Sequence, residues 1–142
     1  MGKLAVIYWS GTGNTQSMAE AVLEGAKAAG ADAQLFEVNE IDANTAATYD
    51  QLALGCPAMG DEVLEEGDFE PFFTDLEGKL SGKKVALFGS YGWGDGKWMR
   101  DWQDRCTAAG AQLVGGEGVM ANEAPDEEAL TACKALGQAL AG

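Results

Sequence analysis

Apolar and polar residues alternate along the chain in blocks that predict strands and helices in turn. Four short, almost wholly apolar runs have the length and composition of buried strands: residues 4–9 (LAVIYW), 33–38 (AQLFEV), 51–56 (QLALGC) and 85–90 (VALFGS). A weaker fifth strand is expected near Gln112–Val114, with a continuation at Val119–Met120. Because strands this apolar are typical of parallel sheets covered on both faces, we expect such a sheet.

Segments with helical spacing fill the gaps between these runs. Apolar residues share one face of a helix expected from Asn14 to Ala29, and of another from about Lys97 to Ala109. A third helical spacing joins Phe69 to Leu80, and a last helix follows Pro125, with acids in its first turn. The alternation of strand and helix predicts one α/β domain over residues 1–142, without repeats or linkers.

The net charge of −14 is large for a chain of 142 residues. Repulsion between its carboxylates and phosphates excludes nucleic acid as a partner. The acidity favours either solubility alone or steering toward partners with a basic docking surface. No apolar run is long enough to cross a membrane, and no secretory signal pattern begins the chain, so we expect a cytoplasmic protein, with a monomer as the default.

Histidine is absent, which excludes Ser-His-Asp and Cys-His nucleophilic sites and histidine-ligated metals. The three cysteines, Cys56, Cys106 and Cys133, are widely spaced and form no C-x-x-C motif, so we expect small core residues. We therefore predict neither catalytic residues nor a metal site.

Three unusual loops leave the carboxyl ends of predicted strands: Ser10–Thr15, Pro57–Glu62 and Ser90–Gly96. In sheets of this kind, ligands bind beyond those ends, where the strand order reverses. We expect the three loops to meet at one edge of the sheet and to form a ligand site there.

The first loop, WSGTGNT over residues 9–15, suits a phosphate although it contains no cation. It lacks the third glycine of a dinucleotide loop, where Gln16 stands, and the lysine of a Walker loop. Its three hydroxyls, one amide and the N-terminus of the following helix can hold a terminal phosphate monoester. The alternative is an ordinary strand-to-helix turn with a Ser or Thr cap.

The other two loops have features that suit a flat ring. The segment CPAMGDEV (56–63) holds a Gly60-Asp61 turn, whose peptide can rotate at low cost, beside the exposed Met59. The glycine-rich segment SYGWGDG (90–96) holds Trp93 between two glycines, as a stacking platform. The alternatives are a turn with a stray methionine and a tryptophan folded back onto the surface.

Together, the motifs WSGTGNT, PAMGDE and GSYGWGDGKWMRDW resemble the short-chain flavodoxins, along essentially the whole chain. The resemblance implies a flavodoxin-like three-layer α/β/α sandwich whose five-stranded parallel sheet has the order 2-1-3-4-5. It also implies one non-covalently bound FMN and one-electron transfer between redox proteins. The stretch from Ala111 to Met120 departs most from the family pattern.

The resemblance also implies a role for individual residues. The 10–15 loop would hold the FMN phosphate with help from Ser90, and Met59 and Trp93 would flank the isoalloxazine ring. Glu62 would hydrogen-bond the ring at N3, and the Gly60 carbonyl would accept a hydrogen bond from N5–H after reduction. Asn122 and Glu123 would approach the flank of the cofactor. The complete predicted set is Trp9, Ser10, Gly11, Thr12, Gly13, Asn14, Thr15, Pro57, Ala58, Met59, Gly60, Asp61, Glu62, Ser90, Tyr91, Gly92, Trp93, Gly94, Asp95, Gly96 and Asn122.

From these residues we predict a low-potential electron carrier that cycles between semiquinone and hydroquinone, because the phosphate and nearby acids disfavour more negative charge on the ring. The alternative function is an NAD(P)H-dependent FMN or quinone reductase of the same fold, which would need room and positive charge for a dinucleotide. A receiver-type signalling module is disfavoured, because Trp9-Ser10-Gly11 and Cys56-Pro57 stand where its acidic residues would be.

Overall fold

The computed structural model describes residues 3–11, 13–59, 62–92, 94–115 and 117–141. The predicted roles of Thr12, Gly60, Asp61 and Trp93 fall outside these residues.

The described strands form one parallel sheet with the predicted order. Its strands are β1 (Lys3–Tyr8), β2 (Asp32–Glu37), β3 (Gln51–Gly55), β4 (Lys84–Tyr91), β5 (Gln112–Leu113) and β6 (Val119–Asn122). The order is β2-β1-β3-β4-β5, and β6 also pairs with β4. Because β5 lies beside the start of β4 and β6 beside its end, the two short strands together fill the place of the predicted fifth strand.

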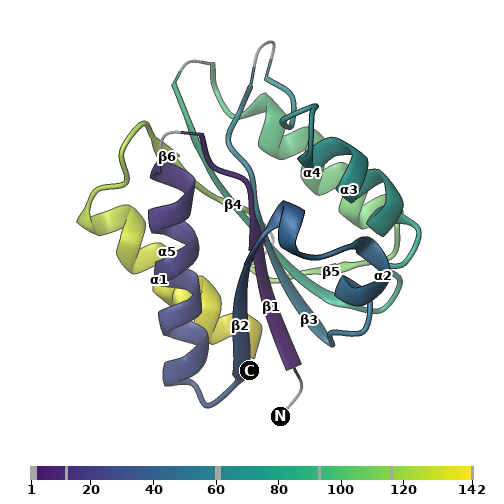
Figure 1. Cartoon of the computed structure of the whole chain (residues 1–142). Coiled ribbons are helices and arrows are strands. Elements are labelled where there is room, and N and C mark those ends of the chain that lie inside the picture. Colours follow the sequence, from purple (N-terminus) through teal and green to yellow (C-terminus); the bar gives the residue numbers. More distant parts are fainter. Residues whose placement is uncertain (1–2, 12, 60–61, 93, 116, 142) are drawn as a thin grey trace.

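Helices cover both faces of the sheet, which confirms the three-layer sandwich. Figure 1 shows α1 and α5 on one face and α2, α3 and α4 on the other. The helices are α1 (Asn14–Ala28), the 3-10 turn η1 (Val38–Glu40), α2 (Ala43–Ala46), α3 (Phe69–Glu77), α4 (Lys97–Ala108) and α5 (Glu127–Ala141). Among the helices of the described residues, only η1 and α2 had no counterpart in the sequence prediction, since both are too short to show helical periodicity.

Alternate side chains of each strand enter two different cores. Leu4, Val6 and Tyr8 face the α1 and α5 side, whereas Ala5 and Ile7 face the side of α3 and α4. The first core is rich in alanine, and the second contains five large buried aromatic rings: Phe69, Phe72, Phe73, Trp98 and Trp102. The sheet therefore separates a core of small residues from an aromatic core.

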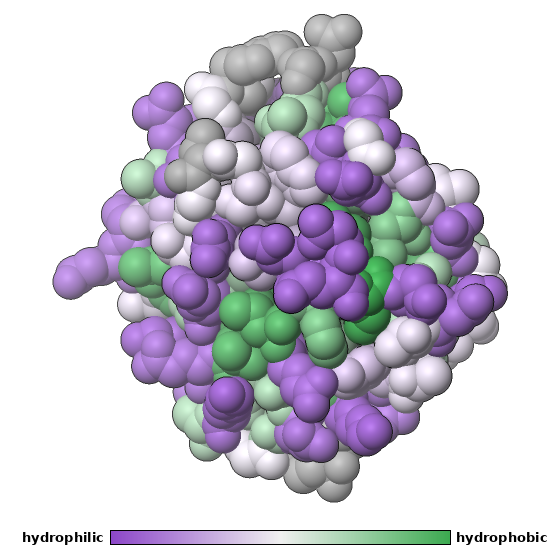
Figure 2. Space-filling view, in the orientation of Figure 1, coloured by the Kyte–Doolittle hydropathy of each residue, from purple (hydrophilic) through white to green (hydrophobic). Residues whose placement is uncertain are grey.

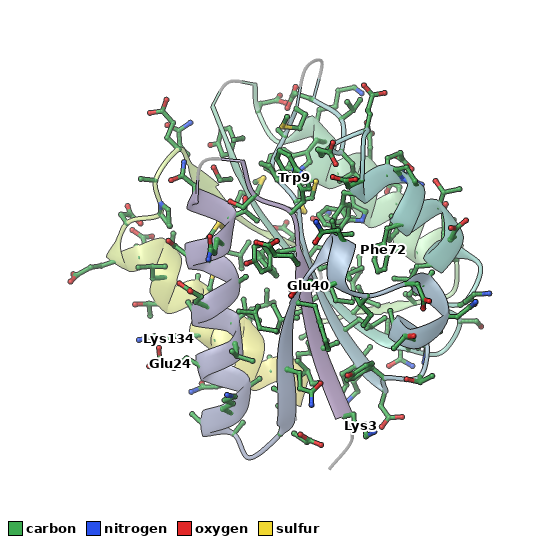
Figure 3. All side chains as sticks on the ribbon, viewed as in Figure 1. Lys3, Trp9, Glu24, Glu40, Phe72 and Lys134 are labelled. Carbon is green, nitrogen blue, oxygen red and sulfur yellow. The ribbon has the colours of Figure 1, made fainter. Side chains whose placement is uncertain are left out.

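The helices of the first core approach one another backbone to backbone. A Cβ atom on Gly25 of α1 would lie 2.0 Å from the Lys134 carbonyl oxygen of α5, and one on Gly137 would lie 2.1 Å from the Val22 carbonyl oxygen. Figure 3 shows Glu24 and Lys134 side by side across this contact, where their charged groups are 3.5 Å apart. Glycine at both positions is therefore what allows α1 and α5 to lie so close.

Candidate functional site

A cavity of about 500 Å³ lies at the carboxyl ends of β1, β3 and β4. Each of the three loops singled out from the sequence contributes to its wall, and Trp9, at the end of β1, is labelled in Figure 3. The segment after β6 contributes as well. The lining residues are Trp9, Gly11, Asn14, Pro57, Ala58, Met59, Ser90, Tyr91, Gly92, Glu123 and Ala124. Aromatic and apolar side chains dominate this wall, as expected of a site for a flat organic ring.

The first loop curls around the hydroxyl of Ser10 at the start of α1. The Ser10 Oγ accepts hydrogen bonds from the Gly13 N–H at 3.0 Å and from the Gln16 N–H at 3.3 Å. Gly13 has a left-handed φ of 92° and provides no side-chain cap, and the first turn of α1 contains no acidic residue. This helix end therefore presents positive partial charge that can stabilise an anion.

Thr15 supplies the most direct sign of a polar ligand. Its side chain is 1% exposed, and among the described residues its hydroxyl has no hydrogen-bond partner. A buried hydroxyl without a partner is costly, and native proteins seldom leave one unsatisfied. Because Thr15 lies in the first turn of α1, its hydroxyl fits a phosphate oxygen held at the helix N-terminus.

Glu62 joins the second loop to the third. Its backbone is in the left-handed region, with a φ of 58°, and its side chain is 9% exposed. The carboxylate Oε1 accepts hydrogen bonds from the N–H groups of Gly96, at 3.2 Å, and Lys97, at 2.9 Å, where α4 begins. The partial positive charge of this helix end stabilises the buried carboxylate. The predicted hydrogen bond between Glu62 and the edge of a bound ring would thus involve a carboxylate that also holds the second loop to the start of α4.

Glu65, which the sequence analysis did not select, holds the end of the second loop to α3. Its carboxylate accepts hydrogen bonds from the N–H groups of Gly67, Asp68 and Phe69 at 2.7–2.9 Å. Burial by itself disfavours the charged form, yet these three donors outweigh it and lower the pKa of Glu65. An acid just before a helical run was the available signal, since it can satisfy the first N–H groups of a helix.

Glu65 should make stability depend on pH. A lowered folded-state pKa stabilises the protein above the ordinary value of 4.5, and that contribution is lost as the pH falls through the folded value. We expect Glu65→Gln to reduce the free energy of unfolding at about pH 7, and the difference from wild type to shrink toward about pH 4. Urea unfolding at both pH values measures this difference in the free energy of unfolding. The substitution Glu66→Gln, at an exposed neighbouring residue, is the control. A difference of constant size across this range would contradict the assignment.

A fourth segment, which follows β6, is hydrogen-bonded to the third loop. The Ser90 hydroxyl donates a hydrogen bond to the Glu123 carbonyl oxygen at 3.0 Å, and the Glu123 N–H donates to the Tyr91 carbonyl oxygen at 2.7 Å. Glu123 is left-handed, with a φ of 56°, and such strained residues cluster at functional sites. Ala124 lies beside it in the wall of the cavity and was not predicted, because alanine carries no chemical signal.

Several predicted residues lie at the margin of the cavity. Asn122 lines a separate cavity of about 330 Å³ beside α5, and its amide nitrogen lies 3.4 Å from the Tyr91 carbonyl oxygen. Asp95 forms an exposed ion pair with Arg100 at 3.0 Å. Gly94 packs against the Glu62 carboxylate, and Gly96 precedes α4. Their predicted contacts with the cofactor remain predictions.

Comparison with known proteins agrees with this architecture. The flavodoxin family model matches residues 6–137. The chain is 51% identical to a flavodoxin of Clostridium beijerinckii over 124 residues, which cover 87% of this chain and 89% of that one. It is 49% identical to a flavodoxin of Megasphaera elsdenii over 136 residues, 96% of each chain.

A solved structure extends the likeness to the fold. The solution structure of the two-electron reduced Megasphaera elsdenii flavodoxin superposes with a TM-score of 0.88 at 48% identity and covers 97% of this chain and 98% of that one. The fold described above is thus shared with a protein that is similar over nearly its whole length. The chain belongs to the flavodoxin family, whose members bind FMN and transfer electrons.

Proposed function

We propose that residues 1–142 form a single domain that binds FMN non-covalently in the loop cavity and acts as a low-potential one-electron carrier between redox proteins. When bound, FMN supplies a ring that can take up and release one electron at a time. The observation that carries the proposal is the buried Thr15 hydroxyl, which has no hydrogen-bond partner among the described residues and lies in the first turn of α1, next to the cavity residue Asn14.

The first loop would hold the phosphate through neutral donors. The Thr15 hydroxyl and the N-terminus of α1 supply hydrogen bonds, and Ser10 keeps the loop curled around them. The two cations at the start of α4, Lys97 and Arg100, form ion pairs with Asp101 and Asp95. Because no described residue of the first loop is a cation, the charge of a bound phosphate would remain uncompensated by an ion pair there.

Negative charge around the cavity supports a low potential. A unit charge about 8 Å away opposes another by roughly 2 kcal/mol at an effective dielectric constant of about 20. The Glu62 carboxylate is buried at the edge of the second loop, and Glu123 lines the cavity. Together with an uncompensated phosphate, they would make the second electron harder to add.

The second loop presents an apolar pair that suits a docking partner. Met59 and Val63 exchange two backbone hydrogen bonds, of 2.8 and 3.0 Å, and are 36% and 39% exposed. The exposed Glu66 and Asp68 follow them along the chain. Figure 2 shows hydrophilic residues over most of the face in view, as expected for a chain with a net charge of −14. An apolar centre with an acidic surround would fit redox proteins that carry a basic surface.

Titration of the apoprotein with FMN tests the proposal directly. We expect uptake of one FMN per chain, followed by two well-separated one-electron steps during anaerobic potentiometric reduction. Anaerobic NADH or NADPH should leave the bound flavin oxidised, whereas rapid bleaching would favour a reductase. A protein that takes up no FMN would overturn the proposal.

Electron transfer to a basic partner should slow with added salt. Raising the ionic strength from about 0.02 M to about 0.3 M shortens the range of surface charges, so the rate to a small basic haem protein should fall about tenfold or more. Stopped-flow absorbance measures this rate, and an uncharged quinone acceptor is the control. Equal salt dependence for both acceptors would contradict a basic docking partner.

A further inference from the structure

The first turn of α4 holds both ends of the second loop. At one end, the indole N–H of Trp98 donates a hydrogen bond to the Cys56 carbonyl oxygen at 3.0 Å. At the other end, the N–H groups of Gly96 and Lys97 donate to the Glu62 carboxylate. Three successive residues of one turn thus contact both ends of a loop that supplies Pro57, Ala58 and Met59 to the cavity wall.

Trp98 also supports the third loop. Its side chain is 1% exposed, and its ring lies 5.6 Å from that of Tyr91, which lines the cavity. A Cβ atom on Gly89 would lie 3.2 Å from the Trp98 ring and 2.2 Å from the Cys56 carbonyl oxygen. The indole therefore fills the space directly behind the point where β3 and β4 end and the second and third loops begin.

From this geometry we propose that Trp98 is a positioning residue. It fixes the second loop relative to Tyr91 and so influences the two one-electron midpoint potentials of FMN bound in the cavity. This inference rests on the proposed function for its redox consequence, but the fixing of the loop is a property of the protein alone. Trp98 itself does not line the cavity, so its effect must pass through Cys56 and Tyr91.

Trp102 is a matched control within the same helix. It lies one turn further along α4, is also 1% exposed, and packs edge-on against Phe69 and Phe73. Among the described residues its indole N–H has no hydrogen-bond partner. Replacement of either tryptophan by phenylalanine removes a similar buried volume from the aromatic core, but only Trp98→Phe removes a bond to the loop.

Hydrogen exchange of the apoprotein tests the positioning role without any cofactor. Backbone amides of residues 58, 59 and 62–64 should exchange about tenfold faster in Trp98→Phe than in Trp102→Phe, because one hydrogen bond that holds the loop is lost. Exchange in α1 and α5 should match between the two variants. Equal exchange of the loop amides in both variants would overturn the proposal.

The FMN-loaded variants supply a second measurement. We expect Trp98→Phe to change the separation of the two one-electron midpoint potentials by about 59 mV, a tenfold change in the corresponding equilibrium, and Trp102→Phe to leave it near the wild-type value. If wild type takes up no FMN, the proposed function fails while the exchange experiment still tests the loop. If wild type takes up FMN and the two variants have the same separation of midpoint potentials, the positioning role is contradicted while the proposed function stands.

A closer replacement guards against misfolding of Trp98→Phe. Site-specific incorporation of benzothienylalanine at position 98 keeps the size and shape of the indole but replaces its N–H group by sulfur. The same faster exchange of residues 58, 59 and 62–64 is expected, with wild-type exchange in α1 and α5. Unchanged exchange of these loop amides would show that the hydrogen bond from the Trp98 indole N–H to the Cys56 carbonyl does not fix the second loop.

Discussion

Replacement of Thr15 by valine should weaken FMN binding by about 10- to 100-fold and leave the apoprotein at least as stable as wild type. A hydrogen bond to a charged group contributes about 1.5–3 kcal/mol, and the phosphate would lose one such bond. In the apoprotein the same hydroxyl is buried without a described partner, so a methyl group of nearly the same shape removes an unsatisfied donor. The two effects therefore have opposite signs.

Fluorescence titration with FMN and urea unfolding of the apoprotein measure the two effects separately. Thr15→Ser is the control, because it keeps the hydroxyl and removes only a methyl group, and it should retain most of the affinity. If Thr15→Val destabilised the apoprotein by more than about 1 kcal/mol, its hydroxyl would have a structural partner. If FMN affinity were unchanged, Thr15 would not contact the phosphate.

Replacement of Gly137 by alanine should destabilise the protein by about 3 kcal/mol, although alanine normally favours a helix interior by about 1 kcal/mol. The new Cβ would lie 2.1 Å from the Val22 carbonyl oxygen and 2.9 Å from the Ala26 nitrogen, and neither backbone atom can move without displacing α1. Since α1 begins at the phosphate loop, its displacement should also weaken FMN binding.

Urea unfolding measures this loss, with Gly78→Ala as the control. Gly78 ends α3 with a helical φ of −72°, and a Cβ atom there would have no neighbour within 4 Å. That substitution should therefore be neutral or slightly stabilising. Equal stability of the two variants would mean that α1 and α5 can separate at little cost.

The fold was predictable because each strand and long helix carries its own periodic signal. The run LAVIYW has both faces buried in a parallel sheet, and in β1 Leu4 to Tyr8 are indeed all buried. The split between β5 and β6 was visible as a weak strand with a continuation, because the intervening glycines interrupt the apolar run. Helical elements of three or four residues, such as η1 and α2, give no such signal, because they are too short to show helical periodicity.

The sequence was enough to predict which loops form the site, but not which hydrogen bonds their side chains make. Glycines, hydroxyls and acids at strand ends identified the three loops, because these residue types have few roles inside a sheet. The sequence could not show that Glu62 accepts bonds from the start of α4, or that Ser90 donates to Glu123, since these contacts span 34 and 33 residues. Trp98 escaped notice for a similar reason: its apolar body fits helical periodicity, and only the tertiary structure shows where its N–H points.

The unequal division of aromatic residues between the two cores has a spectroscopic consequence. Among the described tryptophans, Trp9, Trp98 and Trp102 all pack into the core beside α3 and α4, whereas the α1 and α5 side holds Tyr8 and Phe88. The fluorescence of these three tryptophans will therefore report changes in the aromatic core and be little affected by changes in the core beside α1 and α5. Cys133, on the buried face of α5, offers the complementary probe, because its reaction with a thiol reagent would report when that half opens.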